Sequence, residues 1–67
     1  MTRQDEQVLL EFHQIGAVVK VSAVDPVTLT EVSISGPASA GEAALGQAAI
    51  RKLRYVLERR KTTGRAV

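Results

Sequence analysis

Cysteine and tryptophan are missing from this sequence of 67 residues, and His13 is its only histidine. Without cysteine the chain can form neither a disulfide framework nor a thiolate metal site. One histidine does not supply the ligands of a closed zinc site within one chain. A chain of this length buries only about 60% of its unfolded surface. We therefore expect no metal or other cofactor, and stability that comes from good packing or from oligomerisation.

Long apolar runs are missing as well, and this bears on location. No run approaches the roughly 20 apolar residues that cross a bilayer. The first seven residues are polar and lack the apolar segment of a secretory signal. The sequence therefore predicts a cytoplasmic protein that does not associate with a membrane.

Three segments in the first half of the chain have the composition and alternation of β-strands. A turn after the second is predicted from Asp25 and Pro26, which favour a type I turn. Gly36 and Pro37 end the third. Because the connections are short, we expect an antiparallel arrangement. The predicted strands are residues 8–15, 17–24 and 30–35.

The rest of the chain is dominated by one long helical signal, residues 39–61. Ser39 and Glu42 fit a capping box at its start. The interior contains no proline, and Gly64 can provide a left-handed residue just past the end. Apolar residues fall on one side of this helix and charged residues on the other. The helix therefore needs an apolar surface to cover.

Together these segments predict an α+β fold, in which a three-stranded antiparallel β-meander is followed by one long C-terminal α-helix packed on one sheet face. The single β-β-β-α domain is expected to span residues 8–61. Residues 1–7 are expected to be disordered, and residues 62–67 to form a flexible basic tail. The predicted core consists of Val8, Leu10, Phe12, Val19, Val21, Val32, Ile34, Leu45, Ala49, Leu53, Val56 and Leu57.

Apolar residues outside this core predict self-association. One helix covers only one face of a sheet, and exposed apolar area usually marks an interaction site. The connection at residues 14–17 also lacks an Asn-Gly or Asp-Gly hairpin signal, so the first two strands could run on and pair with a second chain. We expect a homodimer, and exchange of the N-terminal strand or of the C-terminal helix is one way in which it could form. The predicted self-association residues are Leu9, Ile15, Val18, Val24 and Leu29.

Charge is unevenly distributed, although the formal net charge is only +2. Residues 1–50 contain two basic and six acidic side chains, a net charge of −4, whereas residues 51–67 contain seven basic and one acidic, a net charge of +6. Basic side chains can contact phosphates and an aromatic ring can stack on a base. The same cations also complement the helix dipole. The candidate nucleic-acid contacts are Arg51, Lys52, Tyr55, Arg59, Arg60 and Lys61.

Residues that could carry catalysis are few. Glu11 and His13 share one strand face, but no serine is obviously placed to be activated by them. Residues 36–41 open a helix, yet they lack the P-loop lysine and the three-glycine dinucleotide pattern. We therefore predict no catalytic, cofactor-binding or metal-binding residues. The expected function is that of a non-enzymatic protein-interaction module, with weak RNA or other nucleic-acid binding as the alternative.

Several segments resemble a family of short uncharacterised bacterial proteins. The resemblance covers roughly residues 8–60 and implies a free-standing small domain of unknown function, with no activity, cofactor or site residue to transfer. Leu29 departs from the family pattern, in which glycine is natural in that loop. This departure predicts a strained turn or a leucine that a partner covers. The segments that carry the resemblance are residues 25–28, 31–34, 36–37, 39–45 and 52–57.

Overall fold

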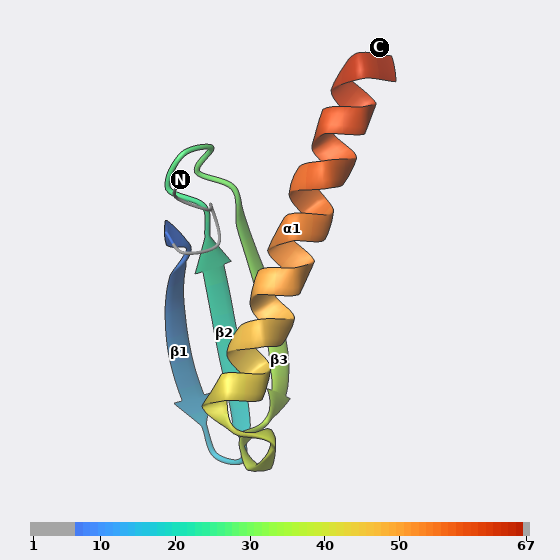
Figure 1. Cartoon of the computed structure of the whole chain (residues 1–67). Coiled ribbons are helices and arrows are strands. Elements are labelled where there is room, and N and C mark those ends of the chain that lie inside the picture. The colour runs from blue at the N-terminus through green and yellow to red at the C-terminus, as the bar shows by residue number, and fades with distance from the viewer. Residues whose placement is uncertain (1–6, 67) are drawn as a thin grey trace.

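The fold is a three-stranded antiparallel sheet followed by one long helix, as the sequence predicts (Figure 1). The computed structural model describes the backbone of residues 7–66 and the side chains of residues 7–60. The strands lie in the order β1-β2-β3, which is their order along the chain. A short 3-10 helix, Ala38–Ala40, leads into the long helix. The main elements are β1 (Leu9–Ile15), β2 (Val18–Val24), β3 (Glu31–Pro37) and α1 (Glu42–Ala66).

The structure describes little of the predicted N-terminal segment but much of the predicted C-terminal one. Residues 1–6 of the expected disordered N-terminus lie outside the described residues. At the other end α1 continues to Ala66, whereas the sequence favours an end near Lys61 with Gly64 beyond it. The flexibility of residues 62–67 stays a prediction.

A tight hairpin joins β1 to β2 within the chain. The two strands pair from Leu9↔Val24 to Ile15↔Val18, so that only Gly16 and Ala17 form the loop. Gly16 has a φ of 62°. Ala17, the second loop residue, does not have a positive φ, since Leu29 is the only non-glycine residue with one in the described part of the chain. Glycine with positive φ at the first loop position is the pattern of a type II′ turn. A search for Asn-Gly or Asp-Gly missed this signal, and β1 folds back onto β2 instead of running on into it.

The connection between β2 and β3 is wider than the predicted type I turn. The backbone carbonyl of Asp25 accepts a hydrogen bond from the N–H of Leu29 at 2.7 Å, and the Asp25 N–H donates to the carbonyl of Thr30 at 2.9 Å. Leu29 has a φ of 63°, a region that costs a residue with a Cβ about 1–2 kcal/mol. The structure thus agrees with the expectation of a strained turn at this leucine, whose side chain is 77% exposed.

Replacing this leucine by glycine tests the strain. We expect Leu29→Gly to raise the free energy of unfolding by about 0.5–1 kcal/mol, because the relief of the left-handed conformation exceeds the entropy that glycine adds to the unfolded chain. Urea denaturation followed by circular dichroism measures the change. Leu29→Ala is the matched control, since it removes the same exposed side chain and keeps the strain. An equal gain from alanine would show that strain is not the cause.

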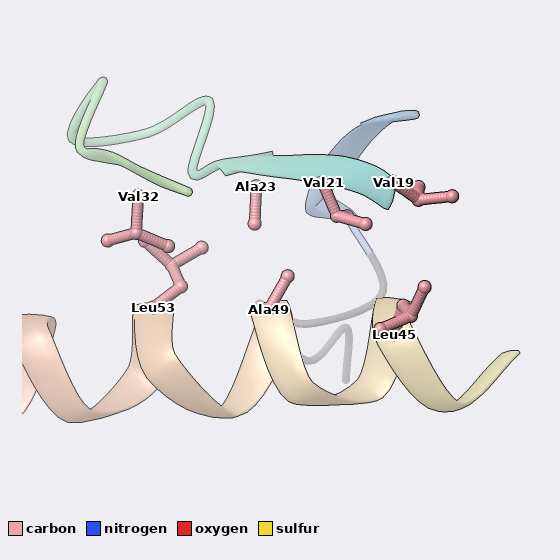
Figure 2. Close-up of a cluster of buried hydrophobic side chains, with 7 residues drawn as sticks. All are labelled: Val19, Val21, Ala23, Val32, Leu45, Ala49 and Leu53. Atoms are coloured by element: carbon pink, nitrogen blue, oxygen red, sulfur yellow. The ribbon is translucent and has the colours of Figure 1, made fainter. Parts of the chain in front are cut away.

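The core lies between α1 and the β2–β3 half of the sheet, and Figure 2 shows its side chains meeting across the two layers. Most of the predicted core residues are buried or pack against the core, but Leu10 is 37% exposed. Its exposure follows from the position of the helix, which leaves β1 at the margin. Ala23 is fully buried and was not among the predicted core residues. The buried cluster consists of Val19, Val21, Ala23, Val32, Leu45, Ala49 and Leu53.

The start of α1 differs from the predicted capping box. The helix begins at Glu42, and the residue before it is Gly41, whose carbonyl accepts the first helical hydrogen bond from the Leu45 N–H at 3.1 Å. Ser39 lies in the preceding 3-10 turn instead. Gly41 has a φ of 90°, so a backbone turn that favours glycine takes the place of the expected serine cap.

Candidate interaction surfaces

The sheet face that points away from α1 has apolar residues at its two ends. Strand register places Ile15 beside Val18 near the hairpin, and Leu9 beside Val24 near the β2–β3 loop. We call Ile15 and Val18 the hairpin patch. Leu9, Val24 and Leu29 are the loop patch, because Leu29 belongs to the loop at that end of the sheet.

The predicted self-association residues therefore do not form one patch within a single chain. Ile15 lies six positions along the strand from Leu9, which is about 20 Å at 3.3 Å per residue. Polar cross-strand pairs fill the interval, with Glu11 opposite Ser22 and His13 opposite Lys20. Glu11 and His13 are both exposed on this face.

The face of β1 on the helix side is covered only in part. A Cβ added to Gly46 of α1 would lie 3.3 Å from Leu10 Cδ1 and 3.5 Å from Phe12 Cζ, so these two side chains reach the helix where it lacks a side chain. Ile50 and Leu57 follow Gly46 at helical spacing and are half-buried. Phe12 is half-buried too, so the flank of the core at β1 stays partly open.

The two edges of the sheet are treated differently. On β3 the Lys52 Nζ donates a hydrogen bond to the Ser33 carbonyl at 2.9 Å, and Pro37 ends the strand. Lysine and proline are residues that commonly block edge strands from pairing. The sequence of β1 contains neither. Among the described residues, nothing pairs with its outer side.

The basic end of the helix is partly occupied by contacts within the chain. Arg60 Nη1 donates to Thr30 Oγ1 at 2.8 Å, and Lys52 holds the β3 edge. Arg59 lies over the Tyr55 ring, 5.6 Å from its centroid, and donates to the Tyr55 hydroxyl at 3.1 Å.

Four of the six candidate nucleic-acid contacts, Lys52, Tyr55, Arg59 and Arg60, therefore have a structural partner that sequence reasoning did not foresee. Arg51 is exposed, and the side chain of Lys61 lies outside the described residues. Nucleic-acid binding at this end stays a prediction.

Two further searches cover the described part of the chain. Among residues 7–66 there is no group of three or more histidine, cysteine or acidic residues that could hold a metal ion. Within the same range, no helix is both long and apolar enough to cross a membrane.

These elements define a small α+β domain in which one helix covers part of one face of a three-stranded sheet. A family model described as a domain of unknown function, DUF6898, matches residues 5–60, and the chain belongs to this family. No curated protein and no solved structure matches the chain. The family match confirms the resemblance found in the sequence, and like that resemblance it assigns no activity.

Proposed function

We propose that the protein is a non-enzymatic interaction module of the cytoplasm, which forms a homodimer and uses the combined surface to bind a larger protein. The observation that carries the proposal is the exposure of large apolar side chains on both ends of one sheet face. Apolar surface of this extent on a small domain usually marks a site of association. The exposed fractions are 61% for Leu9, 70% for Ile15 and 52% for Val18.

The size of the core supports self-association in particular. Seven side chains form the buried cluster, and a domain of this length is marginal when a single small core is its main source of stability. The sequence offers no disulfide to compensate. Burial between two copies of apolar area that a single copy leaves open would add the stabilisation that one copy lacks.

The mass in solution tests the proposal. Light scattering after size exclusion, at low and at high salt and over a range of chain concentrations, should give the mass of two chains in both salts. Salt screens charges over about 10 Å at 0.1 M but leaves apolar contacts in place. A mass of one chain at every concentration would overturn the homodimer. A dimer that dissociates in high salt would show that charge, and not the apolar surface, holds the two copies together.

A further inference from the structure

We propose that two copies of this protein join through the free edge of β1, with the two β1 strands antiparallel around a two-fold axis at Phe12. The two three-stranded sheets then form one six-stranded sheet, with both α1 helices on the same face. This inference rests on the proposed homodimer and specifies its interface. It uses a side of the sheet that sequence analysis did not single out.

The backbone N–H and C=O groups of successive strand residues point alternately to the two sides of the strand. This alternation defines which residues of β1 can pair with a second copy. In a two-residue hairpin the residues that flank the loop, here Ile15 and Val18, exchange backbone hydrogen bonds. Alternation along the strand then turns the N–H and C=O groups of Leu10, Phe12 and Gln14 toward the free edge. The same alternation carried across β2 predicts that the Ser33 carbonyl points out of the β3 edge. The hydrogen bond from Lys52 to that carbonyl confirms the assignment.

This alternation permits only a few registers between the two β1 strands. Residues 10, 12 and 14 of one copy must face residues of the same set in the other, so the two-fold axis passes through a residue of the strand. An axis at Glu11 places Glu11 opposite itself, and an axis at His13 places His13 opposite itself. An axis at Phe12 instead places Glu11 opposite His13 of the second copy on both sides of the axis. Two Glu11 carboxylates directly opposite repel each other, whereas an imidazole N–H of His13 can donate a hydrogen bond to the Glu11 carboxylate. The register centred on Phe12 forms this pair twice, and it is the register we select.

This register also pairs all seven residues of β1, from Leu9 to Ile15. On the helix side, Phe12 meets Phe12 of the second copy, beside the half-covered Leu10. The open flank of each core, which includes Ile50 and Leu57, faces the corresponding flank across the axis. A second copy therefore covers the apolar area that α1 leaves exposed at β1.

On the opposite face the register unites patches that are separate in one chain. Leu9 comes to lie opposite Ile15 of the second copy. Since Leu9 pairs with Val24 and Ile15 pairs with Val18, the loop patch of one copy and the hairpin patch of the other form one apolar row. Neighbouring strands lie about 4.8 Å apart, so four such residues extend over roughly 14 Å. The dimer presents two such rows, and they are the surface on which we place the larger protein partner.

In this register one face of β1 is complementary to the same face of a second β1. We therefore propose a second copy of the chain, and not an unrelated strand, as the partner at this edge. On the face away from α1, Glu11 and its possible hydrogen-bond donor His13 lie at equal distances from Phe12, and so do apolar Leu9 and Ile15. An isologous interface requires this kind of self-complementarity. The β3 edge is blocked by Lys52 and has no comparable symmetry.

Cross-linking between two variants tests both the edge and the register. Glu11 and His13 of the second copy would form a non-hydrogen-bonded pair with Cα atoms about 4.5 Å apart, within the range of a disulfide. The chain has no cysteine of its own. We expect a covalent dimer under mild oxidation when Glu11→Cys and His13→Cys are mixed. Each variant alone should give little, because its two cysteines would be about 7–8 Å apart on the diagonal.

A mixture of Ser33→Cys and Ser35→Cys is the matched control, since it places the same spacing on the β3 edge. Far-UV circular dichroism shows that each variant is folded. Suppose that light scattering shows a dimer. If the mixture then does not cross-link, or if the single variants or the β3 control cross-link equally well, the β1 interface is overturned and the homodimer stands. A monomer by mass would overturn both.

Discussion

Leu53→Ala is expected to lower the free energy of unfolding by about 2–5 kcal/mol, the largest effect of any single truncation in this core. Leu53 is 1% exposed and points from α1 toward Val32 of the sheet (Figure 2). Ala23 and Ala49 are also members of the buried cluster, and such small side chains cannot extend into the space that the leucine leaves. The cost therefore includes the cavity as well as the lost transfer of the side chain from water.

Urea denaturation followed by circular dichroism, at one fixed chain concentration, measures this loss. The concentration is fixed because association contributes to apparent stability. Leu57→Ala is the matched control on the same helix, since Leu57 is only half-buried and should lose less. Domains of this size have a free energy of unfolding of only about 3–10 kcal/mol, so Leu53→Val serves as a milder variant if alanine prevents folding. Equal losses at both positions would contradict the position of the core.

The fold could be predicted from the sequence because its signals are local. Alternation along three short segments defines the strands, and an apolar stripe at helical spacing defines the covering helix. What the local patterns do not contain is where the helix crosses the sheet. Leu10 has the alternation of a core residue but lies at the margin, while Ala23 is buried because it points from the central strand β2 toward α1. Both differences follow from the lateral position of the helix.

The candidate surfaces could be predicted only as a set of residues. Composition identifies Leu9, Ile15, Val18, Val24 and Leu29 as surplus apolar residues, but the cross-strand register is needed to show that they form two patches. The pairing proposed for the β1 edge depends on which backbone N–H and C=O groups point outward. Side-chain patterns in the sequence do not contain this information. The basic residues show a similar limit, because the contact of Arg60 with Thr30 joins residues that are far apart in the sequence.

The loop between β2 and β3 contains a buried polar cluster around Asp25, which is 1% exposed. Its Oδ1 accepts a hydrogen bond from the Val27 N–H at 3.1 Å, and its Oδ2 accepts one from the Thr28 hydroxyl at 3.0 Å. The Thr28 and Thr30 hydroxyl oxygens lie 2.9 Å apart, and Arg60 donates to Thr30. A turn prediction at Asp25 accounts for its position but not for its burial.

Asp25→Ala is expected to lower the free energy of unfolding by about 2–3 kcal/mol, because hydrogen bonds to a charged group are stronger than neutral ones and both donors lose their acceptor. Asp25→Asn keeps one acceptor oxygen and should lose about half as much. Urea denaturation measures both variants, and an alanine variant as stable as the original chain would contradict a structural role for the cluster. The expected loss has a consequence for the basic helix end. Arg60 reaches this loop through Thr30, so a cluster that stabilises the fold makes Arg60 part of the fold and leaves fewer cations for an external phosphate.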